Sequence, residues 1–265
     1  MANTRWTVVT GASAGIGEEL ARLFAADGDG LVLVARRKDR LEALAGELTA
    51  THDVPVKVLA LDLAEPDAPR KLFDWIAGEG ITVHTLVNNA GFGLRGAFHE
   101  LSAERQDEMV RLNVAALTAL SRLFLPGMIA RRDGGILNVA SMAAFQAGPF
   151  MAVYYATKAY VLSFTEALHE EAKPYGVKVS ALCPGPVATE FIAIAGLEGR
   201  RMFDRAPDAA SVARTGHAGY RANKAIVVPG FTNKLGIFFG KLMPRALTRA
   251  VVRRLNASDP GAPLG

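Results

Sequence analysis

The fold is decided by the stretch Thr10-Gly11-Ala12-Ser13-Ala14-Gly15-Ile16-Gly17. A β-branched apolar run ends at its first residue, and residues 18–24 beyond it have helical periodicity. Glycines in the pattern G-x-x-x-G-x-G let the backbone turn tightly and bring its N–H groups and the helix N-terminus up to a phosphate. A turn of this kind can also be purely structural. Its place between a strand and a helix favours a phosphate site to which Gly11, Ser13, Gly15, Ile16 and Gly17 contribute.

Apolar runs like the one before this turn recur along the chain. They are Thr7–Thr10, Leu31–Val34, Val56–Leu61, Thr85–Val87, Ile136–Val139, Val177–Leu182 and Ile226–Val228. Helical stretches separate them, an alternation typical of a parallel sheet with helices on both faces. We therefore predict one Rossmann-like, doubly wound α/β domain over residues 1–265, with about seven strands. Ligands of such sheets bind at the carboxyl ends of the strands.

Composition narrows the class of protein. The chain has 265 residues, of which 50% are hydrophobic and 21% charged, as in a soluble globular domain. Its net charge of +4 comes from scattered Lys and Arg, so nucleic-acid binding is not indicated. No run approaches the roughly 20 apolar residues of a spanning helix. Because the N-terminus leads directly into the first strand, we expect no signal peptide.

Cysteine and histidine give little sign of redox or metal chemistry. Cys183 is the only cysteine and lies in a strand-like run, which predicts an inert buried thiol and a reducing, cytoplasmic location. The five histidines form no spaced cluster with cysteine or acidic residues, so no metal is expected. The G-x-S-x-G pattern of serine hydrolases is also absent from the sequence.

The second strand ends in Val34-Ala35-Arg36-Arg37, where a dinucleotide fold that prefers NAD carries an acid for the ribose hydroxyls. Here Arg36, helped by Arg37 and the Ser13 hydroxyl, would meet the charge of a 2′-phosphate. A solvated basic start to the next helix is the alternative. We expect NADP(H) to be preferred over NAD(H).

The run Tyr154-Tyr155-Ala156-Thr157-Lys158 places a phenol one helical turn before an ammonium. A cation close to a phenol favours its ionised form, and a phenol in this setting can exchange a proton with a carbonyl oxygen. The spacing also occurs by chance in many helices.

Other motifs occur in a fixed order around this pair. They are Asn88-Asn89-Ala90-Gly91, Asn113, Ser141 and Pro184-Gly185-Pro186-Val187-x-Thr189. With the glycine turn and the Tyr-x-x-x-Lys run, they make residues 5–230 resemble the short-chain dehydrogenase/reductase family, in its single-domain reductase branch.

The resemblance implies catalytic roles. Ser141 would donate a hydrogen bond to the substrate oxygen, and Tyr154 would be the general acid in reduction. Lys158 would lower the pKa of that phenol and hold the nicotinamide ribose. Asn113 would position a water that relays protons, or would only cap or kink a helix. Tyr155 also lies within reach of Lys158, but the family spacing selects Tyr154.

The resemblance also implies cofactor contacts. Asp62 would contact the adenine, unless it is the N-cap of a helix ahead of Pro66. Val187 would meet the nicotinamide carboxamide and Thr189 the phosphates. The remaining contacts would come from Asn89, Ala90, Gly91, Tyr154, Lys158, Pro184 and Gly185. A homodimer or homotetramer formed through the helices near residues 113–131 and 151–172 is expected on the same ground.

The last part of the chain departs from the short family core. Residues 190–207 are expected to form a substrate lid, whose apolar residues are Phe191, Ile192, Ile194, Leu197, Met202 and Phe203. These indicate a hydrophobic substrate if they face the cleft, but they can equally belong to the core or to a subunit interface. The extension 231–265 alternates basic with apolar residues, as a membrane-surface segment does. Because Pro244 interrupts it, we favour packing over the pocket or against another subunit.

Taken together, these features predict an NADPH-dependent oxidoreductase that reversibly reduces a ketone or aldehyde, with a hydrophobic small molecule as its substrate. One alternative is a ketoreductase for lipids or acyl thioesters at a membrane surface. Another is a non-catalytic NADP-binding regulatory protein, which would normally lack a catalytic side chain.

Overall fold

The computed structural model describes residues 4–197 and 206–257. Seven parallel strands form one sheet in the order β3-β2-β1-β4-β5-β6-β7. The strands are β1 (Trp6–Thr10), β2 (Gly30–Ala35), β3 (Val56–Ala60), β4 (Val83–Asn88), β5 (Gly135–Val139), β6 (Lys178–Leu182) and β7 (Ile226–Val227). Each predicted apolar run coincides with one strand to within two residues. The doubly wound fold is therefore confirmed.

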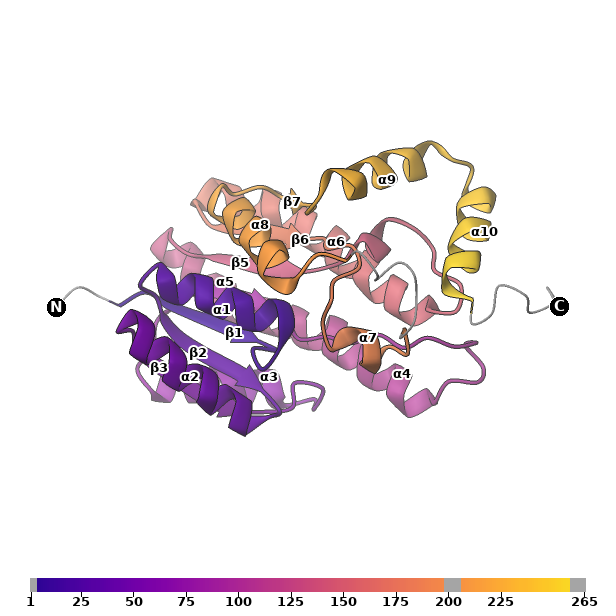
Figure 1. Ribbon diagram of the computed structural model, residues 1–265. Coiled ribbons are helices and arrows are strands. Elements are labelled where there is room, and N and C mark those ends of the chain that lie inside the picture. Colours follow the sequence, from indigo (N-terminus) through magenta and orange to yellow (C-terminus); the bar gives the residue numbers. More distant parts are fainter. Residues whose placement is uncertain (1–3, 198–205, 258–265) are drawn as a thin grey trace.

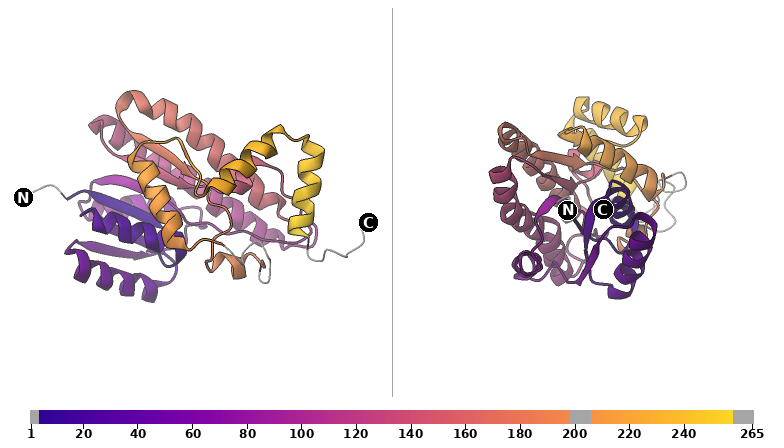
Figure 2. Two further views of the ribbon diagram at one scale, coloured as in Figure 1. Left: turned by 45° about the horizontal axis from the view of Figure 1, so that its top comes forward. Right: turned by 90° about the vertical axis from the view of Figure 1, so that its left-hand side faces the viewer.

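Helices cover both faces of the sheet (Figures 1 and 2). One face carries α1 (Gly15–Ala26), α2 (Lys38–His52) and α8 (Ala209–Arg221), and the other carries α3 (Ala68–Gly78), α5 (Leu117–Arg131) and α6 (Ala152–Ala172). Neighbouring strand residues point to opposite faces of the sheet. Val9 belongs to the hydrophobic core that includes Phe24 of α1, whereas Val8 belongs to the core that includes Leu120 of α5. The sheet is buried on both sides, as its nearly continuous apolar strands predict.

A long helical run leads into the second face. It begins as α4 (Ala103–Val110), passes through the π-helical segment η1 (Arg111–Ala116) and continues as α5. By length and composition alone, the run of 29 residues is apolar enough to cross a membrane. Its side chains Leu120, Phe124 and Met128 are buried against the sheet, however, as in the core helix of a globular domain.

The remaining elements lie at or near the carboxyl ends of the strands, apart from the short 3₁₀ turn η3 (Lys173–Tyr175), which precedes β6. They are the 3₁₀ turn η2 (Met142–Phe145) and the helices α7 (Phe191–Ile194), α9 (Phe231–Leu242) and α10 (Arg245–Asn256). Of the predicted lid, the stretch with Met202 and Phe203 lies outside the described residues. Pro244 separates α9 from α10 as expected, and Figure 1 shows the two helices as a bent arm beyond the sheet.

Candidate active site

A cavity of about 540 Å³ opens at the carboxyl ends of the strands. It is lined by residues that follow six different strands, β1 to β6, as the fold class predicts. Nearly every predicted site residue lines it, namely Gly11, Ser13, Gly15, Ile16, Arg36, Arg37, Asp62, Asn89, Ala90, Gly91, Ser141, Tyr154, Lys158, Pro184, Gly185, Val187 and Thr189. Gly17 and Asn113 are the predicted residues that do not line this cavity.

The glycine turn forms one wall of the cavity. Gly11 and Gly15 have φ values of +66° and +61°, which favour glycine because side chains with a Cβ rarely adopt them. Gly17 packs tightly behind this wall: a Cβ there would lie 2.3 Å from Asn89 Nδ2 and 2.4 Å from the Gly11 carbonyl oxygen. The Asn89 amide donates to the carbonyls of Thr10 (3.0 Å) and Gly11 (3.2 Å). Gly17 thus lets the turn close onto Asn89.

Two arginines mark the adjacent end of the cavity. The Arg37 guanidinium donates to the Ser13 hydroxyl, with 3.1 Å from Nη2 to Oγ. Arg36 has a side chain that is 63% exposed, and its Nη1 lies 3.6 Å from Asp62 Oδ2 and 3.5 Å from Glu108 Oε1. Both arginines line this end of the cavity. Arg37, rather than Arg36, is the one joined to Ser13.

Asp62 lines the same end but is not a helix cap. Its Oδ1 accepts a hydrogen bond from the Ala64 N–H at 3.0 Å, which closes a local turn after β3. The next helix, α3, begins only at Ala68, after Asp67. The N-cap interpretation of Asp62 is therefore wrong, and its position on the cavity wall remains.

Glu190 lines the cavity, although no sequence motif includes it. Its carboxylate accepts hydrogen bonds from Arg37 (2.8 Å) and Arg40 (2.5 Å), and these bonds lower its pKa. It precedes α7 directly, so it ties the start of the predicted lid to the basic end of the cavity. Nothing in the local sequence pairs it with arginines about 150 positions away.

Tyr154 and Lys158 lie one turn apart on α6, and both are buried. The Lys158 ammonium nitrogen is 5.9 Å from the centroid of the Tyr154 ring and donates to the Val139 carbonyl at 2.8 Å. Burial lowers the pKa of Lys158 to about 8 and raises the pKa of Tyr154 to about 12, although a hydrogen bond with Ser141 opposes the latter shift. Desolvation therefore sets the direction of the shift, and the predicted acidifying effect of Lys158 on this phenol stays a prediction.

Ser141 stands between the end of β5 and the turn η2. Its Oγ accepts a hydrogen bond from the Ala143 N–H at 3.1 Å, which fixes the start of the turn. Ser141 and Tyr154 both line the cavity, and the interaction with Ser141 lowers the pKa of the Tyr154 phenol. A single carbonyl oxygen placed there would face both donors.

Tyr155 has a separate partner. The Asn256 amide, at the end of α10, lies 3.3 Å from the Tyr155 hydroxyl and donates to it. The ring is held against Gly148, where an added Cβ would lie 2.2 Å from a ring carbon. Tyr155 therefore anchors the C-terminal helix, while Tyr154 is the phenol that shares a hydrogen bond with Ser141.

Asn113 lies in the π-helical segment behind the cavity wall. Its amide donates to the Phe92 carbonyl (2.9 Å) and to Thr157 Oγ1 (3.1 Å), and its Oδ1 accepts from the Phe92 N–H (3.1 Å). These bonds match the interpretation of Asn113 as a kink residue, since π-helical turns interrupt regular helices and often mark functional sites. Its proposed role in holding a water remains a prediction.

The other end of the cavity is apolar. Its lining includes Phe92, Met151, Phe191, Ile194, Leu197 and Leu255. Arg95 joins two parts of this wall, because its Nε donates to the Gly196 carbonyl at 2.9 Å and its Nη1 to the Asn256 carbonyl at 3.2 Å. Sequence reasoning missed Arg95, Leu255 and Asn256, since no motif connects positions so far apart.

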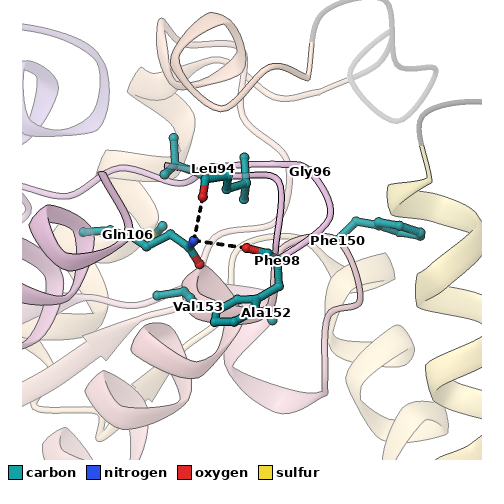
Figure 3. A pocket seen from close by; sticks show the side chains of 9 residues that line it. Leu94, Gly96, Phe98, Gln106, Phe150, Ala152 and Val153 are labelled. Carbon is teal, nitrogen blue, oxygen red and sulfur yellow. Dashed lines mark hydrogen bonds between the residues drawn. The ribbon is translucent and has the colours of Figure 1, made fainter. Parts of the chain in front are cut away.

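A second cavity, of about 20 Å³, lies under the loop before α4 (Figure 3). The Gln106 amide holds this loop by donating to the carbonyls of Phe98 and Leu101, each at 3.2 Å. A space of this size holds one water and no organic substrate. The large cavity is therefore the candidate site.

Comparison with known proteins identifies the family. The family model described as short chain dehydrogenase matches residues 5–195. The chain belongs to this family. Short-chain dehydrogenases are NAD(P)-dependent oxidoreductases that act on carbonyl and hydroxyl groups.

Among curated relatives, a very-long-chain 3-oxoacyl-CoA reductase of Anas platyrhynchos is 36% identical over 192 residues, which are 70% of this chain and 61% of the relative. The chain thus spans less than two thirds of that relative's length.

Solved short-chain dehydrogenase structures match over nearly the whole chain. A short-chain dehydrogenase from Sphingobium yanoikuyae in complex with NADPH has a TM-score of 0.81 and 30% identity, covering 97% of this chain and 99% of that one. A bulky-bulky ketone specific alcohol dehydrogenase from Comamonas testosteroni has a TM-score of 0.77 and 28% identity, with coverages of 99% and 100%.

Proposed function

We propose that this protein is an NADPH-dependent reductase of a ketone or aldehyde carried on a large apolar molecule. One observation carries the proposal: Ser141, Tyr154 and Lys158 share a single cavity with a glycine turn and two arginines at one end and an apolar wall at the other. The residues fit a nicotinamide dinucleotide, because the left-handed glycines leave the turn without side chains where a pyrophosphate would approach. When bound, the cofactor supplies the hydride.

The chain's own residues supply the proton and hold the carbonyl oxygen. With its pKa raised to about 12, Tyr154 stays protonated at neutral pH, which is the form that donates a proton during reduction. Ser141 donates a hydrogen bond to the same oxygen and stabilises the negative charge that develops on it. Lys158, with a pKa of about 8, is largely charged at neutral pH and adds to that stabilisation.

The preference for NADPH rests on Arg36 and Arg37. The Arg37 fork already donates to Ser13 at the cavity wall, and Arg36 lies beside it. Because charge-assisted hydrogen bonds contribute about 1.5–3 kcal/mol each, Arg37→Ala is expected to lower kcat/KM for NADPH roughly 10- to 100-fold and to leave that for NADH nearly unchanged. Arg40→Ala is the matched control, since Arg40 also pairs with Glu190 but does not line the cavity. Equal efficiency of the wild-type protein with both cofactors would refute the preference.

The apolar wall supports a hydrophobic substrate. Phe191, Ile194 and Leu197 come from the described part of the predicted lid, and Leu255 comes from α10. The names of the relatives favour two forms of such a substrate: a bulky ketone and a long-chain 3-oxoacyl thioester. We propose a ketone with bulky apolar groups as the first candidate, because the solved ketone-specific structure aligns over the whole chain, C-terminal helices included.

A substrate panel tests this function. NADPH consumption is measured with small ketones, bulky aromatic and alicyclic ketones, and 3-oxoacyl thioesters of short and long chain. We expect kcat/KM to rise with apolar size, and a preference for the thioesters would select the second candidate. If no member of the panel is reduced, the protein is not a carbonyl reductase and the regulatory alternative gains support.

A further inference from the structure

The arm formed by α9 and α10 carries an unpartnered apolar face. On α9, Phe231, Leu235, Phe238, Phe239 and Leu242 lie on one side of the helix, with exposures of 77%, 43%, 57%, 54% and 67%. No residue of α9 is buried. Its opposite side faces the protein, where a Cβ added to Gly236 would lie 3.8 Å from the end of Met142. The apolar side thus points away from the body of the molecule.

The second helix of the arm also exposes apolar side chains. Leu247, Val251 and Leu255 repeat every four residues along α10 and are exposed, whereas Thr248, Val252 and Asn256 are buried against the protein. Of the thirteen large apolar side chains that are exposed in residues 4–197 and 206–257, eight lie on this arm. Such a concentration on two helices indicates an interaction surface.

The charged residues of the arm are all basic. Residues 231–257 contain six basic residues and no Asp or Glu, while the rest of the chain has 24 Lys and Arg against 26 Asp and Glu. The six are Lys234, Lys241, Arg245, Arg249, Arg253 and Arg254. Among the described residues, none of these six forms a salt bridge. Two identical arms would repel one another, whereas an anionic surface would attract the arm.

The arm also borders the cavity. Leu255 and Asn256 line it, and Asn256 fixes the end of α10 by donating to the Pro149 carbonyl at 3.0 Å and to the Tyr155 hydroxyl. A surface that covers the exposed side of α9 and α10 would therefore lie next to the apolar end of the site. This placement matters if the substrate is apolar, and so rests on the proposed function.

We propose that the α9–α10 arm docks the protein on an anionic lipid surface, with its aromatic side chains in the apolar layer and its cations at the headgroups. Aromatic and aliphatic side chains on one side of a helix, flanked by Lys and Arg, are the composition of helices that lie in a membrane interface. When the protein is docked in this way, an apolar substrate enters the cavity directly from the lipid layer.

Flotation with vesicles tests the docking. The wild-type protein is mixed with vesicles of phosphatidylcholine or of an equal mixture of phosphatidylcholine and phosphatidylglycerol. We expect the wild-type protein to bind the anionic vesicles at low ionic strength. This binding should decrease with added salt. Phe238→Ser with Phe239→Ser is expected to weaken binding at least about tenfold, because both rings lose their apolar contact. Tyr175→Ser, which removes an exposed aromatic ring from η3, is expected to have no effect.

Two outcomes overturn the proposal. One is the lack of binding by wild-type protein to anionic vesicles at low salt. The other is a wild-type dimer, seen by analytical ultracentrifugation, that the double substitution converts into a folded monomer while vesicle binding stays unchanged. In that case the arm is a subunit interface. Reduction of a water-soluble ketone by each variant, measured without lipid, reports separately on the proposed function, since Phe238 and Phe239 do not line the cavity.

Discussion

The chain has two parts that contribute to one cavity in different ways. Residues 5–195, which match the family model, supply the glycine turn, the two arginines and the Ser141 and Tyr154 hydroxyls. Residues 206–257 supply a wall through α10, and their arm is largely exposed and attached by a few hydrogen bonds. Tyr154 and Lys158 are buried, whereas the side chains of the arm are mostly exposed. The same kind of substitution should therefore have unequal effects in the two parts.

The adjacent tyrosines give the largest expected contrast. Tyr154→Phe removes the proton donor and is expected to lower kcat/KM about 10³-fold, within the range of general acid catalysis. Tyr155→Phe removes the hydroxyl that accepts from Asn256 and is expected to retain a readily measured rate. Both variants should be compared by steady-state kinetics, with circular dichroism as a control for folding. A lost rate in the Tyr155 variant alone would reverse the assignment.

One Gly→Ala substitution in each part compares how tightly the two parts are packed, through the free energy of unfolding. Gly17→Ala forces a Cβ against Asn89 and the Gly11 carbonyl, so the free energy of unfolding is expected to fall by about 3 kcal/mol and NADPH binding to weaken. Gly236→Ala, on α9, meets only the end of Met142 at 3.8 Å and is expected to stabilise by up to about 1 kcal/mol through helix propensity. Urea unfolding and fluorescence titration with NADPH measure these effects. Equal destabilisation by both would contradict the packing described here.

The pH dependence of reduction separates Lys158 from Tyr154. The pKa of Lys158 is lowered to about 8, so its ammonium loses a proton as pH rises through that value, while Tyr154, at about 12, stays protonated. The kcat/KM for reduction is therefore expected to fall about tenfold for each pH unit above 8 if the charge is required.

Substitution of one lysine in each part of the chain tests the source of this pH profile. Lys158→Met is expected to remove the alkaline limb together with most of the activity, whereas Lys241→Met on the arm should leave the profile in place. A wild-type rate that is constant from pH 7 to about pH 10 would show that the charge of Lys158 is not needed.

The smallest expected effect lies at the contact between the two parts. Asn256→Ala removes the amide that donates to the Pro149 carbonyl and to Tyr155. Net hydrogen-bond contributions predict a rise of roughly two- to tenfold in KM for a bulky ketone, with kcat nearly unchanged. Asn233→Ala, which loses a bond to the Pro229 carbonyl away from the cavity, is the control. A fall in kcat without a change in KM would place Asn256 in the chemistry instead.

The sequence was sufficient wherever structure depends on local spacing. Apolar runs located the strands, and the glycine spacing located the turn, because both follow from backbone geometry within a few residues. The helical period placed Tyr154 and Lys158 on one face of α6. The choice between the neighbouring tyrosines needed the family resemblance, and the contact with Asn256 supplied its structural reason.

The sequence was insufficient where contacts join distant residues or depend on desolvation. The pairing of Glu190 with Arg37 and Arg40 spans about 150 positions. That Arg37 rather than Arg36 reaches Ser13 depends on side-chain direction at adjacent positions. The rise in the pKa of Tyr154 could not be predicted, because a charge at a known spacing is visible in a sequence and the surrounding low dielectric is not.

The π-helical segment between α4 and α5 changes the rotation of one helix relative to the other about their common axis. A π turn accommodates one more residue than an α turn, so α4 is out of phase with α5 by one residue, about 100° around the axis. Gln106 and Met109 of α4 and Leu120 of α5 all face inward with that offset present. Deleting one residue of Arg111–Ala116 would give a continuous α-helix. It would rotate α4 about its axis, so that Gln106 and Met109 would no longer face inward. The extra residue thus sets the rotation of α4 relative to α5, and with it the orientation of the loop before α4.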